Sequence, residues 1–174
     1  MVALRPLRED EYDAWDAAHR AEYEHGLVEF AGMSRDDARA KVERDIPSVL
    51  PDGLGTPDVW IWAVEADGRR VGTVFLGRRG EDLWLYDITI DVGEREKGHG
   101  RAAMLALEEE VRLLGHESVA LNVWGGNEVA RGLYRSLGYV EESVHMRKRL
   151  QSSGVNSTIA ASRASRADRG KRAT

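Results

Sequence analysis

The sequence predicts a single domain of the α/β (α+β) class, in which helices pack on a mixed, mostly antiparallel sheet. Two observations lead to this prediction. The chain has 174 residues with 42% hydrophobic content, enough to build one domain with a substantial core. Its apolar patterns follow the order strand, two helices, three strands, helix, strand, helix and strand. That order is typical of one sheet covered by helices.

The first part of the chain predicts a strand and two helices. Residues 2–7 have the alternation of a strand, and residues 8–30 have a helical period. The side chains spaced three or four apart on one face of this first helix are Tyr12, Trp15, Ala18 and Glu22. Ser34 followed by Asp37 is a helix N-terminal signature, which begins a second helix over residues 36–46.

The middle of the chain predicts three consecutive strands. Residues 47–57 contain three prolines and two glycines, so a loop precedes the strands. A tight turn joins residues 59–65 to residues 70–77 as a hairpin, and the third strand covers residues 83–91. Its alternation places on one face Leu83, Leu85 and Asp87. The opposite face then carries Trp84, Tyr86, Ile88 and Ile90.

The last part of the domain predicts helix, strand, helix and strand. The first of these helices ends at Gly115, and its buried face is formed by Met104, Leu107, Val111 and Leu114. A short helix over residues 127–138 follows a strand over residues 118–124, and residues 139–150 form the final strand.

Composition limits the classes of function. The chain has no cysteine, which excludes disulfides, thiolate metal ligands and an acyl-cysteine intermediate. Its histidines have no metal-ligand spacing, so we predict no metal. Because the sequence shows no signal-peptide core and no apolar run of membrane-spanning length, we expect a soluble cytoplasmic protein with no membrane partner.

Charge is distributed unevenly along the chain. Residues 151–174 carry five basic residues and one acidic residue, Asp168, which gives them a net charge of +4. Because the whole chain has a net charge of −5, residues 1–150 have a net charge of −9. This basic tail has few large apolar residues and is predicted to be disordered, which leaves a domain over residues 1–150. An acidic domain repels nucleic acid and attracts cationic ligands such as amines. We therefore expect nucleic-acid contact through the basic tail or not at all.

A turn at residues 95–101 can bind an anion. Where such a turn leads into a helix, unpaired backbone N–H groups point in one direction and the helix dipole adds positive charge. Gly98 and Gly100 would let a phosphate approach the backbone. The spacing does not fit the nucleotide P-loop, which requires Gly-Lys-Ser/Thr after four intervening residues. It does not fit the dinucleotide fingerprint either, because Ala103 stands where the third glycine would fall. A simple connection is the alternative interpretation of this glycine pair.

A second motif lies in the helix predicted over residues 127–138. Asn127 is a good N-cap. Tyr134 lies at the edge of the stripe formed by Val129, Leu133 and Leu137. Periodicity alone fits either a tyrosine at the rim of the core or a tyrosine with a functional role.

Together the two motifs resemble those of the GNAT superfamily of acyl-CoA-dependent N-acetyltransferases. The first motif is RxxGxG at residues 95–100, and the second is NxxAxxLY at residues 127–134. The order of elements resembles the family over about residues 2–150, and the motifs over residues 83–140. The resemblance implies a mixed, mostly antiparallel sheet of six to seven strands flanked by about four helices.

The resemblance also implies roles for individual residues. In this family the backbone of the turn holds the pyrophosphate of coenzyme A, here through Arg95, Glu96, Lys97, Gly98, His99, Gly100 and Arg101. The strand before the turn splays from the next strand, and its exposed backbone pairs with the pantetheine arm at Ile88, Thr89 and Ile90. Asn127 matches an asparagine that contacts the cofactor. Tyr134 matches a tyrosine near the sulfur, where it also contacts the cofactor and can protonate the departing thiolate.

Two positions depart from the family's pattern. Glu96 stands where a glycine is usual, and a carboxylate beside a pyrophosphate is unfavourable unless it points to solvent or pairs with a cation. Trp84 stands at about the position where many members carry a glutamate that acts as general base.

The proton of the acceptor amine therefore needs another acceptor. Asp87 is the best candidate, because it is a carboxylate in an otherwise apolar strand. Its alternative role is to hydrogen-bond a neighbouring backbone group. Asp91 is nearer the turn, and His99 and His145 are further candidates.

We predict an N-acetyltransferase that moves an acetyl group directly from acetyl-CoA to the amine of a small molecule or peptide, in a ternary complex. The predicted catalytic residues are Tyr134 and Asp87. Acetylation of protein N-termini or lysines, and a CoA-binding regulatory module without chemistry, are the alternatives. The predicted partners are acetyl-CoA and an amine, and the protein is expected to be a monomer or homodimer.

Overall fold

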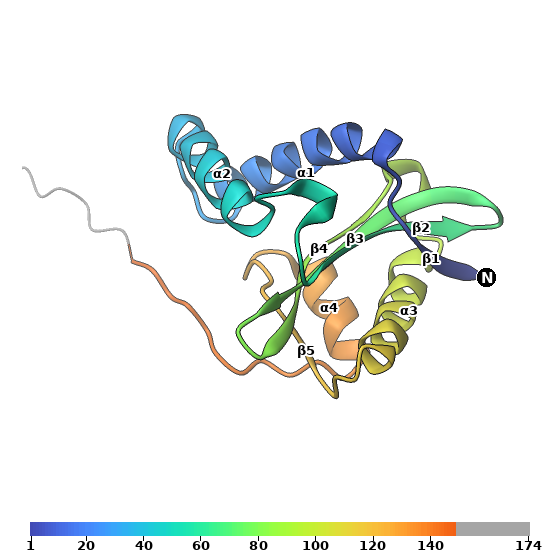
Figure 1. The fold of residues 1–174 in the computed structure, drawn as a ribbon. Coiled ribbons are helices and arrows are strands. Elements are labelled where there is room, and N and C mark those ends of the chain that lie inside the picture. The colour runs from blue at the N-terminus through green and yellow to red at the C-terminus, as the bar shows by residue number, and fades with distance from the viewer. Residues whose placement is uncertain (149–174) are drawn as a thin grey trace, which may run out of the picture. The chain divides into compact units, whose positions relative to one another are not determined.

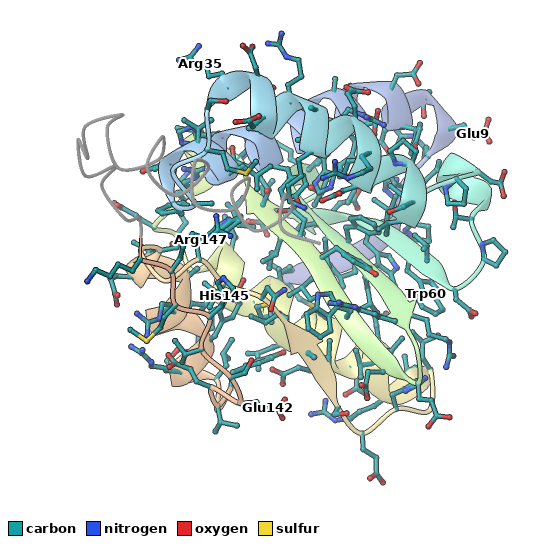
Figure 2. The ribbon with its side chains drawn as sticks, turned by 90° about the vertical axis from the view of Figure 1, so that its left-hand side faces the viewer. Glu9, Arg35, Trp60, Glu142, His145 and Arg147 are labelled. Carbon is teal, nitrogen blue, oxygen red and sulfur yellow. The ribbon has the colours of Figure 1, made fainter. Side chains whose placement is uncertain are left out.

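The computed structural model describes residues 1–148. The chain divides into two units, one over Met1–Val140 and one that begins at Glu141. The described residues of the second unit, 141–148, form no helix or strand, and Figure 2 labels three of their exposed side chains, Glu142, His145 and Arg147. The predicted tail over residues 151–174 lies outside the described residues.

The first unit is built on one five-stranded sheet, in the order β1-β2-β3-β4-β5 (Figure 1). Its strands are β1 (Val2–Pro6), β2 (Val59–Ala66), β3 (Arg69–Arg79), β4 (Asp82–Ile90) and β5 (Val119–Leu121). The first four strands pair antiparallel, whereas β4 and β5 pair parallel. The predicted mixed, mostly antiparallel sheet is confirmed, with five strands in the described part of the chain where six to seven were expected.

Helices cover both faces of this sheet (Figure 1). They are α1 (Glu9–Glu29), α2 (Arg35–Val49), α3 (His99–Leu113) and α4 (Glu128–Ser136). Two hydrophobic clusters fill the spaces between the helices and the sheet. One lies between α1, α2 and the sheet around Phe75, and the other lies between α3 and the sheet around Val74. Figure 2 shows Glu9 and Arg35 on the layer of α1 and α2, with Trp60 on the sheet. The sheet thus separates an α1–α2 side from an α3–α4 side.

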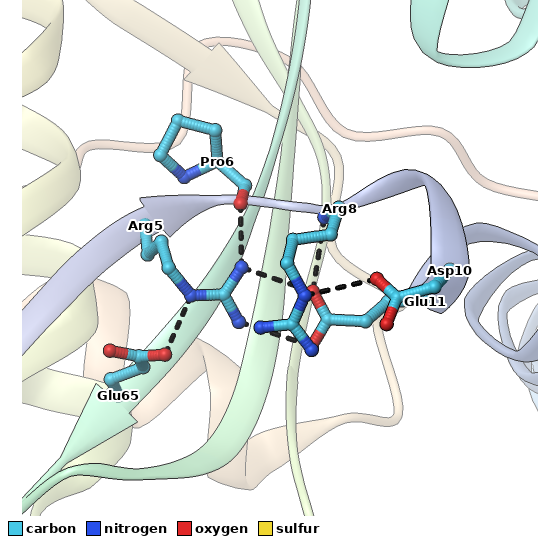
Figure 3. Close-up of polar contacts among 6 residues, drawn as sticks. All are labelled: Arg5, Pro6, Arg8, Asp10, Glu11 and Glu65. Carbon is cyan, nitrogen blue, oxygen red and sulfur yellow. Dashed lines mark hydrogen bonds and ion pairs between the residues drawn. The ribbon is translucent and has the colours of Figure 1, made fainter.

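An ionic network fixes the start of α1 to the sheet (Figure 3). The Arg5 guanidinium donates to the Glu65 carboxylate at 2.6 Å, to Glu11 at 3.0 Å and to the Pro6 carbonyl at 2.8 Å. Glu11 also accepts the backbone N–H of Arg8 at 3.0 Å and so caps the first turn. Hydrogen bonds from Arg5 lower the pKa of Glu11 to about 2. The network sets the direction in which α1 leaves β1.

The buried face of α1 differs from the predicted one. Trp15 is buried as expected, but Ala18 and Glu22 are exposed. The face instead continues from Trp15 through the half-buried His19 and Tyr23. The reason is size: the larger rings bury more apolar surface than an alanine at a neighbouring helical position.

Helix α2 begins as predicted and ends later than predicted. The Ser34 hydroxyl accepts the backbone N–H of Asp37 at 3.1 Å, which confirms the N-cap. The helix then continues through Pro47 to Val49, three residues into the predicted loop. A proline in the last turn removes one backbone hydrogen bond and leaves the preceding turns intact, so it ends the helix only a few residues later.

The predicted final strand over residues 139–150 is wrong for its described part, because residues 139–148 contain no strand. The alternation that favoured it runs through Val140, Val144 and Met146. Glu142 stands in the same series, where a half-buried strand would require an apolar side chain. All three apolar side chains are largely exposed.

Candidate active site

A split in the sheet lies between β4 and β5. The two strands pair only from Leu83↔Val119 to Leu85↔Leu121, whereas β4 continues to Ile90 in register with β3. In the described part of the chain, the β4 backbone past Leu85 therefore has no strand on its β5 side. The predicted pantetheine-binding residues Ile88, Thr89 and Ile90 all belong to this unpaired edge. An extended ligand could add its own hydrogen bonds there.

A β-bulge in β4 shapes the same split. Phe75 pairs with Asp87, whereas the next residue of β3, Leu76, pairs with Leu85, so Tyr86 is the extra residue. Because directly opposite residues share a face, Asp87 lies on the same side as Phe75, towards α1. The prediction that Asp87 shares a face with Leu83 and Leu85 is wrong, since the bulge reverses the alternation.

The glycine turn forms the N-terminus of α3, as the sequence predicts. Gly98 is the N-cap in the left-handed region at φ 83°, which glycine adopts without strain. The Ala102 N–H closes the first turn onto the Gly98 carbonyl at 3.1 Å. The N–H groups of the three preceding helical residues, His99, Gly100 and Arg101, consequently have no partner within the helix. They are available to an anion at the positive end of the helix dipole.

Three basic side chains of the turn are held in place by neighbouring groups. Arg95 Nε donates to the Ile90 carbonyl at 3.0 Å, and Lys97 Nζ bonds the Glu94 carboxylate at 2.9 Å. Arg101 reaches across to Ser136, at 2.7 Å to its hydroxyl. These contacts fix the positive charges around the turn and connect the start of α3 to the end of α4.

Glu96 adopts a left-handed backbone conformation, with φ 62°. This conformation is costly for a residue with a Cβ and easy for glycine. It explains in physical terms why glycine suits this position. The Glu96 side chain is exposed.

Asp87 lies next to His19 of α1 at the split. Its Oδ2 is 3.8 Å from His19 Nδ1 and accepts a hydrogen bond from the Thr89 hydroxyl at 3.1 Å. Both side chains are largely shielded from solvent, with exposed fractions of 9% for His19 and 20% for Asp87. His19 is not among the site residues predicted from the sequence, although it lies one helical turn after Trp15 on the same face.

Tyr134 lies on α4, half-buried beside the ring of Tyr139 at a centroid distance of 5.7 Å. Burial, with a smaller contribution from the negative charge of Asp87, raises the pKa of Tyr134 to about 12. The phenol is therefore protonated throughout the neutral range and can act only as a proton donor there. Asp87 is thus close enough to Tyr134 for their charges to interact.

Asn127 caps α4 with its side-chain oxygen, which accepts the Ala130 N–H at 3.1 Å. Its amide nitrogen then remains as the group that could donate to a ligand. The cap fixes where α4 begins, and with it the place of Tyr134.

The other positions named from the sequence, Trp84, Asp91, His99 and His145, each have surroundings of their own. Arg79 lies over the ring of Trp84 at 4.7 Å, so an aromatic side chain fills that position of β4. Asp91 is exposed, and His99 Nε2 lies 3.6 Å from Glu94 within the glycine turn. His145 is exposed in the second unit.

Residues 1–148 contain neither a metal-binding cluster nor a membrane-spanning helix. No three histidine or acidic side chains there are grouped so that they could hold a metal ion. None of the helices described is both long and apolar enough to span a membrane.

Comparison with known proteins gives consistent matches. Residues 30–139 match the model of the Acetyltransferase (GNAT) family. The uncharacterized N-acetyltransferase YycN of Bacillus subtilis (strain 168) is 26% identical over 154 residues, covering 86% of this chain and 99% of YycN. The crystal structure of YycN matches with a TM-score of 0.83 at 25% identity, over 87% of this chain and 100% of that one. A structure of AAC(6')-Iy in complex with the bisubstrate analogue CoA-S-monomethyl-acetylneamine shares the fold, with a TM-score of 0.56 at 15% identity, over 87% of this chain and 99% of that one.

Proposed function

Because the chain belongs to the GNAT acetyltransferase family, we propose that it transfers an acetyl group from acetyl-CoA to a primary amine of a small molecule or peptide. The observation that carries the proposal is the position of the glycine turn. The unpaired N–H groups at the start of α3 come after the unpaired end of β4, separated from it by a short loop that contains the helical turn Val92–Glu94. A diphosphate and an extended arm are two parts of one ligand that this arrangement fits.

The residues fit acetyl-CoA on two counts. The N–H groups at the start of α3, beside Gly98 and Gly100, suit its diphosphate, and the β4 edge at residues 88–90 suits its amide-containing arm. Arg95 and Arg101 would add charge at the rim, and the Asn127 amide would donate to the arm. The solved AAC(6')-Iy complex, which contains a CoA-linked analogue on the same fold, supports this assignment.

Acetyl-CoA supplies the acetyl thioester that an amine can attack. The chain's own residues then move two protons. The ammonium form first loses one proton to water, because only the neutral amine can attack. As the N–C bond forms and the C–S bond breaks, the amine loses a second proton to the Asp87 carboxylate. The departing thiolate takes one from the Tyr134 hydroxyl, which water then reprotonates. The shielded position of Asp87 beside the split supports its role. The raised pKa of Tyr134 supports the other role, because the phenol keeps the proton that its step donates.

The acceptor is a cationic amine with some apolar surface. Residues 1–150 carry a net charge of −9, which attracts amines. Asp87 lies on the α1 side of the sheet near the rings of Trp15, Phe75 and Tyr86, of which Phe75 and Tyr86 stack at 4.9 Å. A carboxylate beside aromatic faces suits an ammonium group on an apolar frame.

A regulatory CoA-binding module without chemistry is the second candidate. It is favoured by Glu96, whose charge weakens diphosphate binding, and by Trp84 at the position of the family's usual base. Acetylation of a protein amine uses the same residues and differs only in the acceptor.

Tyr134→Phe separates the enzyme from the module. We expect the variant to bind acetyl-CoA within about twofold of wild type in calorimetry and to lower kcat by roughly 10²-fold, since general acid catalysis contributes at least that much. CoA release would be followed with a panel containing tryptamine, phenethylamine, spermidine and a peptide with a free N-terminus. Acetyl-CoA binding without transfer to any amine by wild type would favour the module. Unchanged kcat in Tyr134→Phe would remove Tyr134 from the mechanism.

A further inference from the structure

His19 is a shielded imidazole with an unpaired nitrogen. Its side chain is only 9% exposed, and its Nδ1 is buried and makes no hydrogen bond. A buried polar atom without a partner is unfavourable, so such an atom in a native fold calls for an explanation. The Asp87 carboxylate lies 3.8 Å from this nitrogen.

Two aromatic rings fix the orientation of the imidazole. The Trp15 ring stacks on it at a centroid distance of 5.1 Å and an interplanar angle of 5°, and the Phe75 ring meets it edge-on at 5.5 Å. Trp15 comes from α1 and Phe75 from β3, directly opposite Asp87. These contacts hold the plane of the imidazole beside Asp87.

The charged groups around this pair are few. On α1, Asp16 lies one turn before His19 and is paired with Arg20 at 2.7 Å, and Arg20 also meets Glu43 of α2. The facing residue of β3 is Phe75, which has no charge. Asp87 is therefore the acidic group within ion-pair distance of the imidazole in the described part of the chain.

We propose that His19 and Asp87 act as a coupled pair that shares the proton released by the acceptor amine, a role that rests on the function proposed above. Asp87 touches the amine, and His19 is a positioning residue that acts through Asp87. The amine proton passes to the Asp87 carboxylate and then to His19 Nδ1, so the carboxylate is restored while the N–C bond forms. The 3.8 Å gap closes by a shift of about 1 Å, since catalytic hydrogen bonds are often long before substrate binds.

The pair places proton uptake and proton delivery on opposite sides of the sheet. His19 belongs to α1, on the side where Asp87 points, whereas Tyr134 belongs to α4 on the other side. Asp87 lies at the split, 3.8 Å from His19, and its charge contributes to the raised pKa of Tyr134. An amine could thus lose its proton on the α1 side while the thiolate gains one on the α4 side.

Two substitutions at His19 distinguish proton sharing from packing. His19→Asn keeps a polar atom near the place of Nδ1 but cannot take a proton, and His19→Phe keeps the aromatic packing. We expect both to lower kcat/KM at neutral pH by about tenfold or more, with acetyl-CoA affinity within twofold of wild type. The acidic limb of the pH profile should also change in both variants, whereas a loss of packing alone would lower the rate equally at every pH.

His25→Asn is the matched control. His25 lies on the same helix, exposed by 63% and paired with Glu29 at 2.7 Å, and its replacement should leave rate and pH profile unchanged. A His19→Phe variant with wild-type kinetics, or a His19→Asn variant slowed equally at every pH, would show that the imidazole only packs. These outcomes leave the proposed function intact. Failure of wild type to transfer acetyl groups to any amine would overturn both.

Discussion

Glu96 carries two unfavourable features at one residue of the glycine turn. Its φ of 62° costs about 1–2 kcal/mol for a residue with a Cβ. Its carboxylate also adds negative charge to a turn that we propose binds a diphosphate. The second effect is electrostatic and is screened by salt, whereas the first is not. The two effects can therefore be separated by experiment.

Glu96→Gln removes the charge and keeps the strained backbone, whereas Glu96→Gly removes both. We expect each variant to bind acetyl-CoA about two- to fivefold more tightly than wild type at low salt, with the gain largely lost at 0.5 M salt. Only Glu96→Gly should also raise the free energy of unfolding, by about 1 kcal/mol. Calorimetry and urea unfolding measure the two effects. Equal or weaker binding by Glu96→Gln would contradict a diphosphate at this turn.

Individual residues differ in how well the sequence predicts them. Gly98 and Asn127 were predictable because each serves a local backbone need, a left-handed N-cap and a side-chain cap. His19 was missed and Asp87 was assigned to the wrong face. The two side chains come close together because of a bulge in β4 and the way α1 packs over the sheet. Neither feature can be predicted from a short stretch of sequence.

At the scale of elements, α1 depends on its first turn. Glu11 connects that turn to β1 through Arg5 and caps the helix through Arg8. The pKa of Glu11 is about 2 in the folded protein and 4.5 ordinarily, because Arg5 donates hydrogen bonds to it. The unfolded chain therefore binds this proton more readily than the folded one. The ionised carboxylate stabilises the fold fully above pH 4.5, and this stabilisation is lost as the pH falls towards 2.

Glu11→Gln should lower the free energy of unfolding by about 1 kcal/mol at pH 7, after allowance for solvent screening. The difference from wild type should shrink steadily below pH 4.5, since the wild-type carboxylate also loses its charge there. Urea unfolding at pH 7, 5, 4 and 3 tests this. Asp10→Asn is the control, because Asp10 is 73% exposed and its replacement should change stability by less than 0.5 kcal/mol at every pH. A Glu11→Gln deficit that does not depend on pH would rule out the ionic explanation.

The elements themselves were largely predictable, because their apolar periods differ so clearly between strand and helix. The residues at which the elements end were less predictable. Helix α2 continues through Pro47, and β5 covers only Val119–Leu121 of the predicted strand over residues 118–124. Where β5 ends depends on its pairing with β4. Pairing between distant segments sets that limit, and local sequence does not report it.

For the whole molecule, the order of elements was enough to predict the fold class. One mixed sheet has α1 and α2 on one face and α3 and α4 on the other. The place of the proposed cofactor site then follows from topology. The short parallel pairing of β4 with β5 leaves the split, and α3 begins beside it. The acceptor is less predictable, because its contacts come from α1 and from the strand faces together.

The central claim is that the turn at the start of α3 binds the diphosphate of acetyl-CoA, and it is tested most directly by comparing two ligands. Calorimetry would measure the Kd of acetyl-CoA and of acetyl-pantetheine, which has the same thioester and arm but lacks the diphosphate and the adenosine 3′-phosphate attached to it. We predict a micromolar Kd for acetyl-CoA and binding at least 10²-fold weaker for acetyl-pantetheine, a difference of about 2.8 kcal/mol or more. Equal affinity for the two ligands, or no binding of acetyl-CoA, would contradict the account.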